Sequence, residues 1–284
     1  MPEALRADIA ATGATGVHID ANGIELHALD YAGDGPAVVV LPGITSPAVT
    51  WDFMARELGD LARVVTIDLR GRGLSDTPTT GYTLDDYVVD TLAVIDALGL
   101  DRPTLIGHSL GARIAAAFAA AHPDVVGHVI AIDPPMSNTN RPYPMPLSVF
   151  DAQLNDADAG TDAEGVARFY PAWTERERGL RARWLGTCAR VAVHETHANF
   201  ERETFEPLWQ QLGSNATLVY GTASPVVTHA DVATLRSTNP APAILAVEGA
   251  GHMVPWDRPE QTLSLLRSLL HPLKLSRPAS AETP

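Results

Sequence analysis

The chain has 284 residues, of which 45% are hydrophobic and 19% are charged, a composition typical of a globular protein and not of a disordered one. Its 20 basic and 34 acidic side chains give a formal net charge of −14, which excludes nucleic acids and anionic membranes as partners because both would be repelled. The single cysteine, Cys188, excludes an internal disulfide and a zinc site built from several cysteines.

The first eight residues include acidic side chains and no continuous apolar run, which is not the pattern of a secretory signal. No later stretch approaches the roughly 20 uncharged apolar residues that a membrane-spanning helix needs. We therefore expect a soluble, cytoplasmic protein.

The first predicted elements form an antiparallel hairpin. Residues 16–20 and 24–31 have the composition of strands and flank Ala21-Asn22-Gly23, and an Asn-Gly pair in that place is a strong hairpin signal. The pattern changes at residues 37–41, a continuous apolar run that indicates a strand covered on both faces of a parallel sheet.

Further strands and helices alternate after this point. Apolar runs recur at 64–67, 104–106, 129–132, 217–220 and 244–247, and helical patterns occupy 49–58, 84–98, 110–121 and 260–270. Strands that alternate with helices predict right-handed crossovers and an α/β fold with a mostly parallel, doubly wound sheet.

One long interruption separates two of these strands. Residues 134–213 contain no convincing strand but have helical patterns at 164–169 and 175–188, and so long a connection must have structure of its own. We expect a core domain formed by residues 1–133 and 214–275, with residues 134–213 inserted as a helical cap. The polar, proline-bearing tail at 276–284 is expected to be disordered.

The strongest motif lies where the strand at 104–106 meets the following helix. Gly107-His108-Ser109-Leu110-Gly111 has the Gly-x-Ser-x-Gly pattern of a nucleophile, because a serine on a sharp strand-to-helix turn leaves no room for side chains two positions away. The simpler interpretation is a helix that begins with a capping serine and small residues. The strand before the motif and the helix after it favour the nucleophile, and the spacing does not fit a dinucleotide-binding loop.

A histidine on a glycine-rich loop follows the last predicted strand. His252 in Gly249-Ala250-Gly251-His252 is placed to return over the edge of the sheet and act as the general base. His108 is expected to shape the serine turn, and His194 and His197 lack the spacing of a metal-binding pair.

The third member of such a triad has two candidates. The loop after the strand at 217–220 has no carboxylate where one is common, and Asp231 comes later, where we expect an exposed side chain in the first turns of a helix. Asp133 directly follows the strand at 129–132 and precedes Pro134, which ends that strand at the correct edge of the sheet. We favour Asp133 over Asp231; the simpler reading of Asp133 is a carboxylate that binds nearby amides.

An oxyanion hole is expected from two backbone groups. The N–H of Ile44, which follows Pro42-Gly43, and the N–H of Leu110, directly after the serine, would converge on one oxygen. The loss of one such donor typically costs about 3 kcal/mol of transition-state stabilisation.

These landmarks resemble the alpha/beta-hydrolase superfamily over nearly the whole chain. Within it, the chain is similar to the N-formylmaleamate deformylases of nicotinate catabolism, which also place their acid after the strand that follows the nucleophile. The resemblance rests on residues 41–48, Ile132-Asp133-Pro134-Pro135, Arg141-Pro142-Tyr143-Pro144, Pro171-Ala172-Trp173 and residues 251–257.

The resemblance implies a serine hydrolase that cleaves the N-formyl amide of a small unsaturated acid such as N-formylmaleamate, without a cofactor or a metal. Arg141 enters the predicted cap close to Asp133 and would clamp the substrate carboxylate, with a hydroxyl from Tyr143; the alternative is a surface arginine. Trp173, with Phe169, Tyr170 and Trp184, would line the cap or form its core.

Other activities remain open for the same fold. A carboxylesterase, a hydrolase of C–C bonds in ring-fission products or an acetamidomethylene-succinate hydrolase would share every catalytic residue. Ser109 argues against a haloalkane dehalogenase or an epoxide hydrolase, since both need an aspartate nucleophile. The expected partner is a small acyl substrate, and the expected state is a monomer or a small homo-oligomer.

Overall fold

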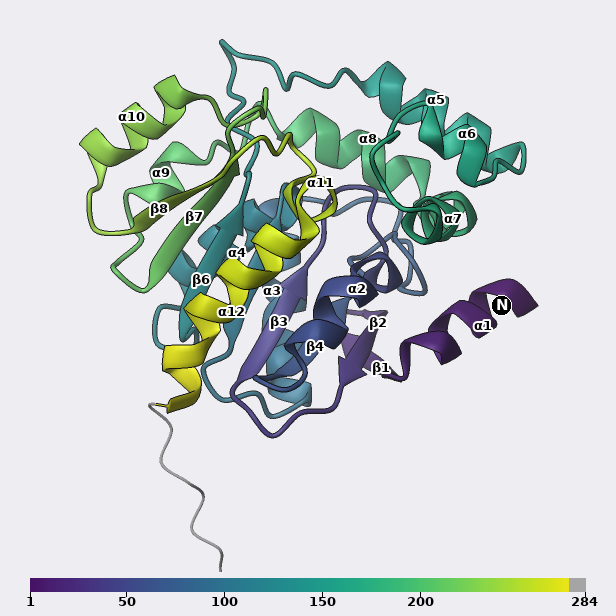
Figure 1. The fold of residues 1–284 in the computed structure, drawn as a ribbon, viewed down its shortest axis with the longest axis horizontal. Helices are drawn as coiled ribbons and strands as arrows, with labels where there is room; N and C mark the ends of the chain where they lie inside the picture. The colour runs from purple at the N-terminus through teal and green to yellow at the C-terminus, as the bar shows by residue number, and fades with distance from the viewer. Residues whose placement is uncertain (276–284) are drawn as a thin grey trace, which may run out of the picture.

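An eight-stranded sheet forms the centre of the computed structural model, which describes residues 1–275 and the side chains up to residue 271 (Figure 1). The predicted tail at 276–284 lies outside the described residues. The strand order is β1-β2-β4-β3-β5-β6-β7-β8. The pairs β1–β2 and β2–β4 are antiparallel, and every later pair in this order is parallel. The strands are β1 (Thr15–Ala21), β2 (Ile24–Tyr31), β3 (Ala37–Leu41), β4 (Arg63–Ile67), β5 (Thr104–His108), β6 (His128–Ile132), β7 (Ala216–Gly221) and β8 (Ala243–Val247).

The apolar runs become buried strands because helices cover both faces of the sheet. In β3, Val39 and Leu41 belong to the apolar core on one face, and Val38 and Val40 belong to the core on the other face. The first face carries α3 (Leu84–Ala97), α4 (Leu110–Ala121) and α10 (His229–Thr238), and the second carries α2 (Asp52–Ala55) and α12 (Pro259–Leu275) (Figure 1). The alternation of side chains along a strand thus fills two cores at once.

Two local details refine the predicted strands. The hairpin turn has Asn22 and Gly23 both at positive φ, 51° and 77°, which is why the Asn-Gly pair marks this position. The prediction that 244–247 is covered on both faces is wrong, because β8 is the edge strand and most of its residues are exposed or half-buried.

The chain between β6 and β7 is helical. It contains α5 (Leu147–Asp158), α6 (Ala163–Ala167), α7 (Glu175–Trp184), α8 (Arg190–Asn199) and α9 (Glu206–Trp209). Figure 1 shows α5 to α8 together over one end of the sheet, whereas α9 packs against α4 beside the core. The division into a core and a cap remains a prediction, with α9 closer to the core than the boundary at residue 213 suggests.

A helix that the sequence patterns did not predict precedes the sheet. α1 (Glu3–Thr12) contacts α7, and the carboxylate of Asp8 accepts hydrogen bonds from Arg183 and from the indole of Trp184. No helix within residues 1–275 is both long enough and apolar enough to cross a bilayer.

Candidate active site

The serine turn has the strained geometry that the glycine spacing predicts. β5 ends at His108, α4 begins at Leu110, and Ser109 between them has a φ of 55°. A Cβ atom at Gly107 would lie 2.0 Å from the carbonyl oxygen of Gly111, and one at Gly111 would lie 1.8 Å from that of Leu41. Both glycines are therefore required for the strand, the turn and the helix to approach this closely.

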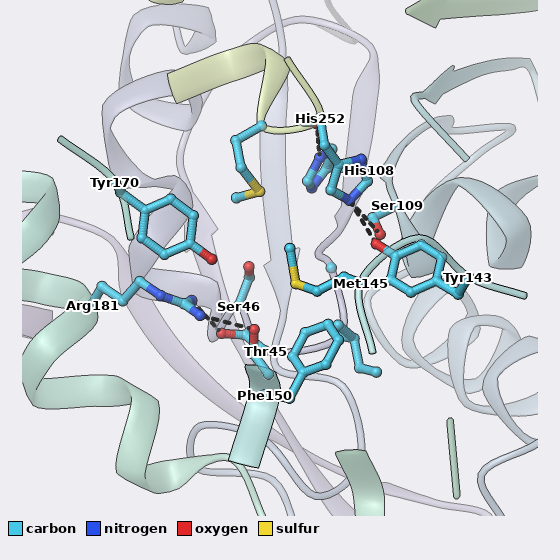
Figure 2. A pocket seen from close by; sticks show the side chains of 13 residues that line it. Thr45, Ser46, His108, Ser109, Tyr143, Met145, Phe150, Tyr170, Arg181 and His252 are labelled. Carbon is cyan, nitrogen blue, oxygen red and sulfur yellow. Dashed lines mark hydrogen bonds between the residues drawn. The ribbon is translucent and has the colours of Figure 1, made fainter. Parts of the chain in front are cut away.

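Three side chains from distant parts of the chain meet beyond the carboxyl ends of β5 and β6. The Nε2 atom of His252 lies 3.1 Å from the Oγ of Ser109 (Figure 2). Its Nδ1 atom lies 2.8 Å from Oδ2 of Asp133. His252 is carried by the loop between β8 and α11 (Val254–Asp257). The three predicted triad residues are thus brought into one hydrogen-bonded chain.

Asp133 is fully buried and well provided with donors. It accepts a hydrogen bond of 2.5 Å from the Ser224 hydroxyl and one of 3.2 Å from the N–H of Gly221, besides the contact with His252. Burial raises the pKa of Asp133, and these three donors act in the opposite direction. The end of β7 and the loop after it therefore supply hydrogen-bond donors to Asp133, and the carboxylate itself follows the neighbouring strand β6.

Asp231 lies elsewhere and has a structural environment. It occupies the first turn of α10, where it forms a capping box with Thr228 and an ion pair with Arg141. The expectation of an exposed side chain is wrong, since only 8% of this residue is exposed. The helix cap explains the carboxylate at this position.

The loop after β3 approaches the serine closely. A Cβ atom at Gly43 would lie 3.3 Å from Nδ1 of His108 and 3.6 Å from the Cβ of Ser109, so the loop lies directly against the serine turn. The loop is also held by guanidinium groups, since Arg72 donates to the carbonyl of Ile44 at 3.0 Å and Arg181 to that of Thr45 at 3.0 Å. The predicted oxyanion donor Ile44 therefore lies on a braced loop at the pocket.

His108 holds the loop that carries the imidazole. Its Nε2 atom lies 2.9 Å from the carbonyl oxygen of His252, an acceptor, so Nε2 must carry the proton. Burial lowers the pKa of His108 to about 3, and it therefore stays neutral at ordinary pH. This agrees with the expectation that His108 shapes the turn.

A small pocket opens in front of Ser109, and its empty volume of about 330 Å³ includes space that is open to solvent. Figure 2 shows Ser109, His252 and Tyr143 on one side of it and Arg181 on the other, with apolar side chains between them. The lining consists of Gly43, Ile44, Thr45, Ser46, His108, Ser109, Tyr143, Met145, Phe150, Tyr170, Arg181, His252 and Met253.

Arg181 is the one lysine or arginine of that lining, and it was not predicted from the sequence. It lies on α7, is 96% buried, and donates to the carbonyl and hydroxyl of Thr45 and to the side-chain oxygen of Gln153, all of which are neutral. Its Nε atom has no hydrogen-bond partner among the described residues. A signal was present: Leu180, Trp184 and Leu185, at spacings of one, three and four residues, mark the buried face of the helix.

The other predicted substrate-binding residues have different positions. Arg141 pairs with Asp231 and donates to the carbonyl of Val226, and it does not line the pocket. Trp173 lies behind the pocket wall, stacked between Tyr170 and Trp256 with ring centroids 4.2 and 5.2 Å away. Tyr143 does line the pocket, but its hydroxyl lies 3.1 Å from Nε2 of His252 and not beside Arg141.

A serine on a strand-to-helix turn, joined through an imidazole to a buried carboxylate, defines a class of hydrolases with this sheet topology. A family model described as the alpha/beta hydrolase family matches residues 38–265. The chain belongs to that family, and we describe it as a hydrolase.

Two relatives are similar over almost the whole chain. N-formylmaleamate deformylase from Pseudomonas putida is 35% identical over 249 residues, which cover 87% of this chain and 93% of that protein. 2-(Acetamidomethylene)succinate hydrolase from Mesorhizobium japonicum is 29% identical over 280 residues, with coverages of 94% and 99%. The crystal structure of an N-formylmaleamic acid deformylase from Pseudomonas putida has a TM-score of 0.84 at 35% identity and covers 89% of this chain and all of that one.

Proposed function

We propose that this hydrolase cleaves the N-formyl amide of a small unsaturated carboxylic acid such as N-formylmaleamate and releases formate and maleamate. The observation that carries the proposal is the buried guanidinium of Arg181, which has no carboxylate partner among the described residues and lies in the same small pocket as Ser109. The similarity to N-formylmaleamate deformylase over 87% of the chain supports the same substrate class.

The proposed reaction uses the hydrogen-bonded chain as a triad. The Oγ of Ser109 attacks the formyl carbon while Nε2 of His252 takes the hydroxyl proton, and Asp133 stabilises the resulting imidazolium through Nδ1. The N–H groups of Ile44 and Leu110 stabilise the oxyanion.

The C–N bond then breaks, and His252 returns the proton to the departing nitrogen, which leaves the formyl group on Ser109. A water molecule, deprotonated by His252, attacks this ester in the same way. The second collapse restores the Ser109 hydroxyl and releases formate, and no step of this mechanism requires a cofactor or a metal.

The charge of the pocket supports an anionic substrate. A buried cation with only neutral acceptors is unfavourable unless an anion joins it, and a guanidinium presents donors that match the two oxygens of a carboxylate. A single cation fits one carboxylate, as in N-formylmaleamate, better than the two carboxylates of a substituted succinate.

The test is a substrate panel on the purified protein. We expect N-formylmaleamate to be hydrolysed with release of formate at a higher kcat/KM than its N-acetyl analogue, 2-(acetamidomethylene)succinate, 4-nitrophenyl acetate or a ring-fission dienoate. Formate is measured enzymatically, and Ser109→Ala is the control that must abolish release. A preference for the ester, for the dienoate or for the dicarboxylate would reject the proposed substrate.

A further inference from the structure

Two hydroxyl groups meet at one nitrogen in this site. The Oγ of Ser109 and the Oη of Tyr143 each lie 3.1 Å from Nε2 of His252 (Figure 2). Nδ1 of the same ring is committed to Asp133, an acceptor, so Nδ1 carries the proton and Nε2 has a single lone pair. Ser109 and Tyr143 therefore compete for this lone pair, and a triad does not need the second hydroxyl.

The tyrosine is held firmly in this position. Only 5% of Tyr143 is exposed, and its ring packs against Phe200 at a centroid distance of 4.9 Å. The turn before it is closed by two backbone hydrogen bonds between Asn138 and Arg141, and Arg141 is tied to α10 by its ion pair with Asp231. The arginine that was expected to bind substrate therefore fixes the segment that carries Tyr143.

The hydroxyl of Tyr143 acts as a donor throughout the reaction. Burial raises the pKa of Tyr143 above its ordinary value, so the phenol keeps its proton. When His252 takes the proton of Ser109, Nε2 loses its lone pair and can no longer accept from Tyr143. The phenol must then donate to another atom within its reach. Its other neighbour, the Ser109 oxygen, becomes a poorer acceptor once it is bonded to the acyl carbon.

The leaving group is the acceptor that the geometry places there. The departing atom must come within hydrogen-bonding distance of Nε2 to receive its proton, and Tyr143 Oη lies 3.1 Å from that nitrogen. A group attached to the departing atom is thus close to the phenol.

We propose that Tyr143 is a catalytic residue that donates a hydrogen bond to the leaving group as the scissile bond breaks. In an N-formyl amide, the electron pair of the C–N bond passes to the nitrogen and is shared with the neighbouring carbonyl oxygen, which accepts from Tyr143. The nitrogen receives its proton from His252, and Tyr143 keeps its own. The hydrogen bond to this second carbonyl on the nitrogen rests on the proposed function, because only that substrate has it. The hydrogen bond to a leaving group in general does not depend on the proposed substrate.

The experiment measures how strongly the leaving group determines the rate. Acetate esters of 4-nitrophenol, phenol and trifluoroethanol share one acyl group and differ in the basicity of the leaving oxygen. For each we compare kcat/KM, which reports acylation, between wild type and Tyr143→Phe. Because a hydrogen bond matters most for the poorest leaving group, we expect the loss in Tyr143→Phe to be about tenfold larger for the trifluoroethyl ester than for the 4-nitrophenyl ester.

A matched variant separates chemistry from packing. Tyr170→Phe makes the same change in the same pocket, but the Tyr170 hydroxyl donates to Gln153 and lies away from His252. It should lower kcat/KM by the same factor for all three esters. Thermal unfolding of both variants checks that they are folded.

An equal loss for all three esters in Tyr143→Phe would overturn the proposal and leave Tyr143 a packing residue. If wild type does not turn over an ester, the rate at which Ser109 is labelled by diethyl phosphate triesters with the same leaving groups gives the same comparison. These outcomes are independent of formate release, so the proposed function and the role of Tyr143 fail separately.

Discussion

At the scale of single residues, Asp133 shows that β6 is the strand whose end supplies the carboxylate bound to His252. Asp133 at the end of β6 has a φ of 48°, a value that non-glycine residues seldom adopt, and this conformation coincides with its hydrogen bond to His252. Ser109 has a similar φ of 55°. Both proposed catalytic side chains therefore stand on strained backbone at neighbouring strand ends.

The choice between the two aspartates leads to a direct comparison. Asp133→Asn should lower kcat by about 10⁴-fold, because the amide favours the wrong tautomer of His252, while the protein stays folded. Asp231→Asn should leave kcat within a few fold and lower the free energy of unfolding by about 1 kcal/mol, since it weakens a helix cap. Steady-state kinetics and urea unfolding of both variants give the answer, and a larger loss of kcat in Asp231→Asn would reject the assignment.

At the scale of elements, the strands were predictable and several helices were not. Continuous apolar runs identified the parallel strands because both of their faces are covered, and the Asn-Gly pair identified the hairpin. The triad residues could be predicted because each stands directly after a strand or within a glycine-rich loop, where topology determines the position. α1, α5, α8 and α9 were not predicted, and their structure depends on the surfaces that they cover.

Arg181 and Tyr143 show the limit of this reasoning. The rotation of α7, which carries Arg181, depends on how the helix packs, and four arginines compete for the inward position between residues 176 and 183. The direction of Tyr143 depends on a turn closed by Asn138 and on an ion pair with a residue 90 positions away. The two contacts that direct Tyr143 leave no local signal in the sequence, whereas the apolar spacing along α7 was a signal for Arg181.

The contact between the β5–α4 turn and the loop of His252 should depend on pH. In the folded protein the pKa of His108 is about 3, against about 6.5 in the unfolded chain, so protons bind preferentially to the unfolded state. The stability that neutral His108 contributes is therefore present above pH 6.5 and is lost as the pH falls.

The expected difference is measurable between pH 7 and pH 5. Over this range wild type should lose about 2 kcal/mol more of its free energy of unfolding than His108→Gln, which cannot titrate but retains a donor for the His252 carbonyl. Urea unfolding at both pH values tests this expectation. Parallel losses in the two proteins would show that His108 does not titrate in this way.

At the scale of the whole molecule, α7 joins the helices above the sheet to the core. Its arginines contact three separate core segments: Arg176 pairs with Asp52, Arg183 pairs with Asp8, and Arg181 donates to Thr45. The last contact is on the loop that carries the expected oxyanion donor Ile44. A substrate anion at Arg181 would thus be recognised where the two parts of the molecule meet, across the pocket from Ser109 (Figure 2).

The central claim is that one pocket combines the Ser109 nucleophile with a carboxylate-binding Arg181. Its most direct test is kcat/KM for N-formylmaleamate relative to 4-nitrophenyl acetate, measured for wild type, Arg181→Met and the matched variant Arg141→Met. The account predicts that this ratio falls by about 100-fold in Arg181→Met, because a buried charge pair with the substrate is lost. In Arg141→Met, which loosens the Tyr143 segment but leaves the pocket cation in place, the ratio should change by no more than a few fold. An unchanged ratio in Arg181→Met, or a collapse confined to Arg141→Met, would contradict it.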